Sequence, residues 1–266
     1  MALPNESSIV SGSLDCTIKI WDTYMGKIEQ ILAGHEGWVR DLVAVDNDSL
    51  ISASDDKTIK IWNLNDGIVI RTLKGHTGNV LALKLLKSGD LASGSSDTSI
   101  NIWNLNDGAV KCKLKGHTHE VWALELLKNG DLASGSSDKT IKIWNVESGA
   151  IKMTLSGHTS HIYKLALLPN GDLVSGSDDA TIKIWSIEER TVKRTLTGHT
   201  DYIFALKVLK SGDLASGSGD GRIKIWDVEN GTVTKEIKVN NTVRSLEVLR
   251  DGELACASGK SIMIWN

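Results

Sequence analysis

The sequence predicts an all-β protein whose short strands assemble into seven consecutive antiparallel sheets. Two observations lead to this fold class. A tryptophan ends a short β-branched run seven times, at spacings of 41, 41, 41, 41, 41 and 39 residues, and no stretch shows helical periodicity. The seven tryptophans are Trp21, Trp62, Trp103, Trp144, Trp185, Trp226 and Trp265.

Each repeat holds four strand-like runs separated by turn residues. In one repeat the turn signals lie at residues 87–90, 95–97, 106–108 and 116–117, where Gly, Asn, Asp and Ser gather. A four-stranded unit of this length cannot bury both faces of its sheet alone, and radial stacking against neighbours removes the exposed faces. We therefore expect a single domain over residues 1–266, a seven-bladed β-propeller of four-stranded antiparallel blades.

Composition and charge narrow the classes of partner. The chain has 30 Lys and Arg against 33 Asp and Glu, so no global basic field attracts nucleic acid or anionic lipid. No apolar run approaches the roughly 20 residues of a membrane helix, and residues 1–8 lack the pattern of a signal peptide. Cys16, Cys112 and Cys256 are odd in number and far apart, which suits reduced thiols. We expect a cytoplasmic protein, with the nucleus as the alternative, that binds no membrane.

Two further signals recur with the tryptophan. A Gly-His pair opens five repeats, and an Asp stands six residues before the tryptophan in six of them. This pattern resembles the WD-repeat (WD40) β-propeller family across essentially the entire chain. The resemblance implies that a His, a strand Ser, the turn Asp and the Trp form a hydrogen-bonded tetrad in five repeats. The implied tetrads are His35, Ser52, Asp56 and Trp62; His76, Ser93, Asp97 and Trp103; His117, Ser134, Asp138 and Trp144; His158, Ser175, Asp179 and Trp185; and His199, Ser216, Asp220 and Trp226.

Elementary chemistry also favours such tetrads. A buried indole, imidazole and carboxylate must satisfy one another, because an orphaned polar group costs about 1–3 kcal/mol. The seventh repeat departs from the pattern, with Asn240 in place of the His and Gly259 in place of the Asp. Its tetrad cannot form, so we expect this blade to be the softest.

The two ends of the chain predict an incomplete closure. The chain starts just before a second strand at residues 9–11 and stops at a third strand that ends in Trp265 and Asn266. Only 22 residues separate Trp265 from Trp21 around the closure, where other repeats have 41, so 19 are absent. We expect the first blade to lack its inner strand and the last its outer strand, and our hypothesis is that the sequence is a fragment of a longer protein.

Function should lie at positions that differ between repeats. Five of the six aromatic residues outside the repeat tryptophans flank the apolar residue that opens each first strand, and residues on either side of a strand position point the same way. The resemblance implies that these positions lie at the top mouth of the central channel, where many WD-repeat propellers bind peptides. The candidate partner-binding residues are Trp38, Arg40, Asn79, Leu81, Glu120, Trp122, His161, Tyr163, Tyr202, Phe204 and Arg244, with Asp55 and Asp178 from the turns.

Two interpretations of this face stay open. Aromatic and arginine side chains are enriched at interface hot spots, whereas bulky residues at a channel mouth can also simply fill it. Arg40 and Arg244 favour the first interpretation, since either could grip a carboxylate or phosphate of a bound segment.

Catalytic and metal sites are not predicted. Ser, His and Asp recur in five repeats beside a tryptophan, which indicates structural fastening rather than a unique nucleophile. His117 with His119, and His158 with His161, each include a repeat histidine, and no Cys or carboxylate cluster completes a metal site. We expect no enzyme activity, no cofactor, no metal and no small-molecule substrate.

Three functional classes follow, in descending order. The first is a scaffold or adaptor that binds a protein or peptide on the top face. The second is a subunit of an RNA-processing or other nucleoprotein complex, and the third is a propeller enzyme. Strand lysines recur at one repeat position and could form a positive ring, but the balanced charge favours solvated blade edges over direct nucleic-acid binding. These lysines are Lys19, Lys60, Lys142, Lys183 and Lys224.

Overall fold

The computed structural model describes residues 1–3, 8–249 and 251–265. These residues form 26 strands in seven small antiparallel sheets and no helix, which confirms the all-β, seven-bladed propeller. A membrane-spanning helix is accordingly absent from the described part of the chain. Asn266, at the end of the last predicted strand, lies outside the described residues.

The chain divides into two compact units. The first comprises Met1–Leu124 with Val146–Ala150, and the second comprises Glu125–Asn145 with Ile151–Asn266. Three sheets lie in the first unit, with orders β1-β2-β3, β4-β5-β6-β7 and β8-β9-β10-β11. Their strands are β1 (Ser8–Gly12), β2 (Thr17–Asp22), β3 (Lys27–Ala33), β4 (Val39–Ala44), β5 (Ser49–Ser54), β6 (Thr58–Asn63), β7 (Val69–Lys74), β8 (Val80–Leu85), β9 (Leu91–Ser95), β10 (Ile100–Trp103) and β11 (Val110–Leu114).

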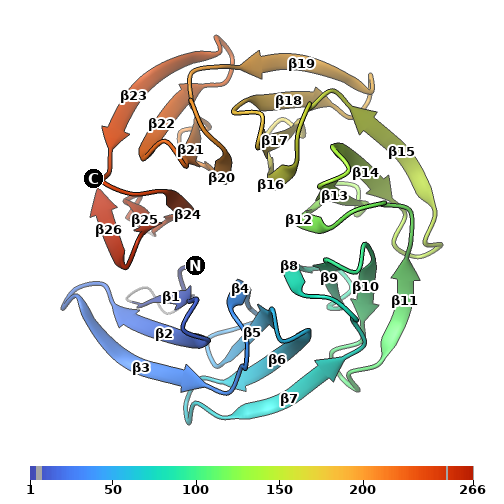
Figure 1. The fold of residues 1–266 in the computed structure, drawn as a ribbon, viewed down its shortest axis with the longest axis vertical. Coiled ribbons are helices and arrows are strands. Elements are labelled where there is room, and N and C mark those ends of the chain that lie inside the picture. Colours follow the sequence, from blue (N-terminus) through green and yellow to red (C-terminus); the bar gives the residue numbers. More distant parts are fainter. Residues whose placement is uncertain (4–7, 250, 266) are drawn as a thin grey trace. The chain divides into compact units, whose positions relative to one another are not determined.

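The remaining sheets have the orders β12-β13-β14-β15, β16-β17-β18-β19, β20-β21-β22-β23 and β24-β25-β26. Their strands are β12 (Val121–Leu126), β13 (Leu132–Ser136), β14 (Thr140–Trp144), β15 (Ile151–Ser156), β16 (Ile162–Leu167), β17 (Leu173–Ser177), β18 (Ile182–Ser186), β19 (Thr191–Leu196), β20 (Ile203–Val208), β21 (Leu214–Ser218), β22 (Arg222–Asp227), β23 (Thr232–Lys238), β24 (Val243–Val248), β25 (Leu254–Ser258) and β26 (Ser261–Trp265). In the second unit β20 lies beside both β16 and β24, as Figure 1 shows.

Several successive sheets pack closely because a second strand carries glycine at the contact point. A Cβ atom at Gly176 would lie 2.5 Å from Ile203 Cγ2, and one at Gly217 would lie 2.2 Å from Val243 Cγ1. Both distances are far below van der Waals contact, so only glycine lets the neighbouring sheet approach this near. The apolar side chains between these sheets form continuous cores, to which Trp226 contributes with 1% of its surface exposed.

The first and last sheets have three strands each, as predicted from the ends of the sequence. Residues 1–3 nevertheless run along β1, where Ala2 forms an antiparallel bridge with Ile9. The backbone nitrogen of Val10 donates to the Met1 carbonyl at 2.8 Å, and the side chain of Leu3 is buried. This short segment partly occupies the place predicted for the missing inner strand.

A β-bulge recurs near the start of the first strand in five sheets. The register between first and second strand shifts there, which leaves one residue of the first strand opposite no partner. The bulged residues are Arg40, Leu81, Tyr163, Phe204 and Arg244. A bulge re-aims the side chain that it carries, so these positions depart from the simple alternation expected from the sequence.

Candidate peptide-binding site

The repeat histidines join hydrogen-bonded tetrads in four of the sheets. In the third sheet His76 Nδ1 lies 2.9 Å from Asp97 Oδ2, and His76 Nε2 lies 2.7 Å from Ser93 Oγ. The indole Nε1 of Trp103 donates to the same Ser93 oxygen at 2.7 Å. The same three contacts join His35, Asp56, Ser52 and Trp62; His158, Asp179, Ser175 and Trp185; and His199, Asp220, Ser216 and Trp226.

The charges within a tetrad follow from burial. Burial lowers the pKa of His76 more than the adjacent carboxylate raises it, so the imidazole is neutral. Burial also acts to raise the pKa of Asp97, but hydrogen bonds from Ser99, the Thr77 backbone and His76 outweigh it and hold the pKa well below the usual range. The neutral ring therefore donates from Nδ1 to the carboxylate and accepts the Ser93 hydroxyl proton at Nε2.

This arrangement suits a fastener. The Ser93 oxygen is fully buried and bonded to two partners, so it cannot approach a substrate as a nucleophile must.

Two further sheets show the hydrogen bond from the indole to a serine. Trp144 donates to Ser134 Oγ at 2.8 Å in the fourth sheet. In the first sheet Trp21 donates to Ser11 Oγ at 2.8 Å, while Asp15 is bonded by Lys19. Sequence reasoning missed Ser11, although it precedes its tryptophan by ten residues, as Ser52 precedes Trp62.

The seventh sheet has Cys256 at the position of the tetrad serine. Cys256 pairs with Met263 and lies two residues after Leu254, the partner of Trp265. Burial raises the pKa of this thiol to about 11, so it stays protonated.

In the second unit the structure brings predicted site residues together. Tyr163 on β16 packs against Phe204 on β20, with ring centroids 5.2 Å apart, and Tyr202 lies 6.0 Å from Phe204 and 6.3 Å from Tyr163. The guanidinium of Arg244 on β24 stacks over the Phe204 ring at 4.6 Å from its centroid. Because Tyr202 is 44% exposed and Arg244 is also exposed, the group presents surface to solvent rather than closing into a core. We call His161, Tyr163, Tyr202, Phe204 and Arg244 the aromatic cluster.

A carboxylate borders the aromatic cluster beside His161. The imidazole of His161 meets the Tyr163 ring edge-on at 6.1 Å, and its Nδ1 lies 3.8 Å from Asp178 Oδ2. Ser160 Oγ donates to that same oxygen at 2.9 Å. The other oxygen, Asp178 Oδ1, is buried without a partner among the described residues. The cluster therefore carries a cation at Arg244 and an anion at Asp178.

The candidate residues of the first unit behave differently. Arg40 stacks over Trp38 at 4.7 Å, but its Nε and Nη2 each donate to a carboxylate oxygen of Asp55 at 2.7 Å. Arg40 and Asp55 thus satisfy one another. Leu81 is only 6% exposed, which corrects its assignment as a partner-binding residue, because the side chain packs into the core.

Three other candidates of this unit are partly buried near the start of β8 and β12. Asn79, Glu120 and Trp122 show intermediate exposure, whereas Trp38 is 44% exposed.

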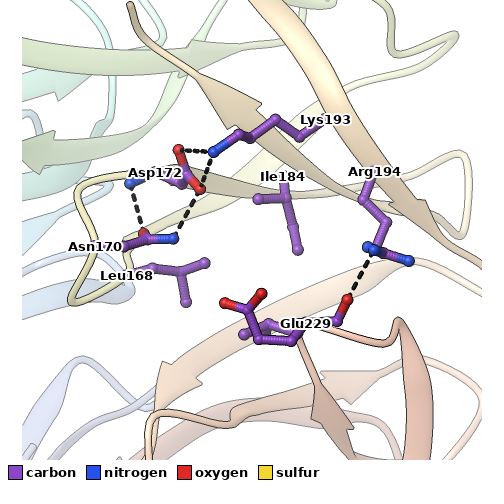
Figure 2. A pocket seen from close by; sticks show the side chains of 8 residues that line it. Leu168, Asn170, Asp172, Ile184, Lys193, Arg194 and Glu229 are labelled. Carbon is purple, nitrogen blue, oxygen red and sulfur yellow. Dashed lines mark hydrogen bonds and ion pairs between the residues drawn. The ribbon is translucent and has the colours of Figure 1, made fainter.

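A hollow whose lining includes no residue of the aromatic cluster lies between the β16–β17 turn, β18, β19 and the β22–β23 turn. Figure 2 shows the residues that line it, and the volume of the hollow is about 140 Å³. Lys193 Nζ donates to Asp172 at 2.8 Å, and Arg194 donates to the carbonyl oxygen of Glu229 at 2.7 Å. Lys193 and Arg194, the two cations of this lining, therefore already have partners. Within the described residues no cluster of three or more His, Cys, Asp or Glu could hold a metal.

Comparison with known proteins identifies the repeats. The family model for the WD domain, G-beta repeat, matches residues 2–22, 26–63, 67–104, 108–145, 149–186 and 190–227. Over 39 residues, 15% of this chain, the sequence is 62% identical to nuclear distribution protein nudF 2 of Aspergillus clavatus and 59% identical to nuclear distribution protein nudF of Aspergillus flavus. Nuclear distribution protein PAC1 of Arthroderma otae is 54% identical over the same length.

These relatives share only a short segment with this chain. The match spans 9% of each nudF protein and 8% of PAC1. The family model, in contrast, covers well over half of the chain and coincides with the strands described above. The chain belongs to the WD-repeat family.

Proposed function

We propose that this protein is a non-catalytic scaffold or adaptor that binds a peptide segment of a protein partner on the aromatic cluster. The observation that carries the proposal is the packing of three aromatic rings and a stacked arginine on adjoining strands, with part of their surface exposed. Aromatic and arginine side chains dominate the energy of protein interfaces, since they bury large areas with little loss of conformational entropy.

Differences between repeats support the same conclusion. Tetrad residues are alike from sheet to sheet, whereas the bulged position holds Arg40, Leu81, Tyr163, Phe204 or Arg244. Positions that build the blade must be alike, and positions that recognise a partner need not be. WD-repeat propellers are in general non-catalytic scaffolds, which agrees with this division.

The curated relatives add little about the partner. Their names refer to nuclear distribution, but the shared segment of 39 residues is about the length of one repeat. It supports the repeat assignment, and we transfer no partner from it.

The nucleoprotein alternative finds less support. Lys60 donates to Thr72, Lys142 to Thr154 and Lys183 to Thr195, each on the neighbouring strand of its own sheet at 3.0–3.2 Å. Each of these ammonium groups therefore already uses one of its three donors within its own sheet, and the balanced charge of the chain supplies no global basic field for nucleic acid.

We also propose a reducing compartment, the cytoplasm with the nucleus as the alternative. The three cysteines are free thiols, and Cys16 and Cys112 are partly exposed. A fluorescent fusion that accumulates in a secretory compartment would contradict this proposal.

Affinity purification with matched variants tests the binding site. Tyr163→Ala combined with Phe204→Ala should lose the partners that the wild type recovers, because the apolar platform is removed. Tyr24→Ala is the control, since Tyr24 is 91% exposed in the turn between β2 and β3. Urea unfolding of all three proteins checks that the fold is retained. Equal recovery by the double variant would move the binding site away from the aromatic cluster.

A further inference from the structure

Arg40 and Arg244 occupy equivalent places in two sheets. Each is the second residue of the first strand in its sheet and stands at the β-bulge. It directly follows a valine that pairs with a serine of the second strand. Each guanidinium also lies flat over an aromatic ring, at 4.7 Å from the centroid of Trp38 and 4.6 Å from that of Phe204. Stacking fixes the plane of a guanidinium and leaves its N–H edge directed away from the ring.

The two arginines differ in what meets that edge. Arg40 donates two hydrogen bonds to Asp55, in the fork geometry that matches a carboxylate. Arg244 has no hydrogen bond or ion pair with any described residue, and it is exposed where Arg40 is half-buried.

The two arginines differ in their partners because the turn that follows the second strand differs between the two sheets. Between β5 and β6 the turn consists of Asp55, Asp56 and Lys57, whereas Gly259 and Lys260 alone link β25 to β26. The shorter turn supplies no carboxylate.

We propose that Arg244 binds a carboxylate of the partner peptide, in the position that Asp55 fills for Arg40. The inference rests on the proposed function and names the chemistry of the partner. An Asp or Glu side chain would meet the guanidinium edge, and an adjacent apolar side chain would lie on Phe204 and Tyr202. The recognised segment is therefore an acidic residue next to an aliphatic or aromatic one.

The charge of the site favours a carboxylate over a phosphate group. A single planar guanidinium matches one carboxylate in both charge and shape, whereas a phosphate dianion calls for further cations. Besides the titratable His161, the charged groups placed at the aromatic cluster include the carboxylate of Asp178 and that of Asp201, whose Oδ1 accepts from the Tyr202 backbone nitrogen at 2.8 Å. A second negative charge on the ligand would be repelled by Asp178.

A random heptapeptide library displayed on phage and selected on the wild-type protein tests this inference. We expect the selected peptides to combine Asp or Glu with a neighbouring Leu, Ile or Phe. A synthetic copy of the strongest peptide should bind the Arg244→Gln variant about 10- to 100-fold more weakly, because two charge-assisted hydrogen bonds are lost. The control is Arg190→Gln, which removes the same charge from an exposed turn between β18 and β19 and should leave the affinity unchanged.

A cycle that changes both sides isolates the contact. Replacing the peptide's acidic residue by its amide should weaken binding to the wild type, and should cost nothing further in Arg244→Gln. Equal affinity of Arg244→Gln and wild type would overturn the inference, and so would a phosphoserine peptide that binds more than tenfold tighter than the acidic one.

The outcomes separate the two proposals. Peptides whose binding depends on Tyr163 but which show no acidic preference would overturn the carboxylate inference and leave the proposed function standing. A selection that yields no peptide dependent on Tyr163 would overturn both.

Discussion

Removal of one tetrad hydroxyl should destabilise the protein strongly. In the Ser93→Ala variant the indole nitrogen of Trp103 and Nε2 of His76 both lose the oxygen that now lies 2.7 Å from each. Trp103 is 1% exposed and His76 is 7% exposed, so water cannot replace the lost partner without opening the sheet. Two buried groups left unpaired at about 1–3 kcal/mol each suggest a loss of about 2–6 kcal/mol. That is a large share of the roughly 5–15 kcal/mol that holds a typical domain folded.

Urea unfolding followed by circular dichroism measures this loss. Ser88→Ala is the matched control in the same unit, because Ser88 is exposed and its hydroxyl bonds within its own turn, donating to Asp90 Oδ2 at 2.9 Å and accepting from the Asp90 backbone nitrogen at 3.3 Å. The control should change the free energy of unfolding by less than about 0.5 kcal/mol. A Ser93→Ala variant as stable as this control would refute the claim that the tetrads fasten the sheets.

Three further predictions concern other buried or strained positions. Burial lowers the pKa of His35, His76 and His199 below the unfolded value of 6.5, so these residues take up protons when the protein unfolds in mild acid. The urea concentration at the unfolding midpoint should therefore decrease as the pH is lowered from about 7 to about 5, and a constant midpoint would contradict this. Thr98 is β-branched at φ 69°, so Thr98→Gly should raise the unfolding free energy by about 0.5–1 kcal/mol in urea titrations, and a decrease would argue against strain there. Both side-chain amide atoms of Asn101 are buried without a partner among the described residues, so Asn101→Leu should raise the melting temperature by the equivalent of about 1 kcal/mol, and a lower melting temperature would contradict this.

Repetition explains why the fold could be predicted from the sequence. The tryptophan, the turn aspartate and the Gly-His pair recur at nearly constant spacing, so five of the seven sheets carry all three signals and the tryptophan alone marks the seventh. The three-stranded first sheet was predicted from the number of residues that are absent between Trp265 and Trp21 around the closure. The pairing of residues 1–3 with β1 did not, because three residues carry no periodic signal.

The site was only partly predictable, because its geometry depends on strand pairing. The expected alternation of side chains between the two faces of a strand assumes that every residue has a cross-strand partner. The bulges leave Tyr163, Phe204 and Arg244 without such a partner. The sequence likewise grouped Arg40 and Asp55 as two free partner-binding residues. The register that pairs Val39 with Ser54 places them together, and they neutralise one another. Leu81 occupies the same bulged position, yet its side chain is buried, so the position alone does not decide whether a residue is exposed.

Asn101 illustrates a departure that the repeat pattern itself could have revealed. Five other sheets have lysine at this strand position, and in four of them it lies opposite a threonine or glutamate on the outer strand. In the third sheet Asn101 lies opposite Lys113, so here the lysine stands on the outer strand. The shorter amide cannot reach solvent from there.

The central claim is that repeated residues fasten the sheets while varying residues bind the partner. The dissociation constant of the library-selected peptide, measured for wild type, Ser93→Ala and Tyr163→Ala where all three are folded, tests it most directly. We predict that Ser93→Ala binds as the wild type does and that Tyr163→Ala binds at least about tenfold more weakly. Weaker binding by Ser93→Ala together with unchanged binding by Tyr163→Ala would contradict it.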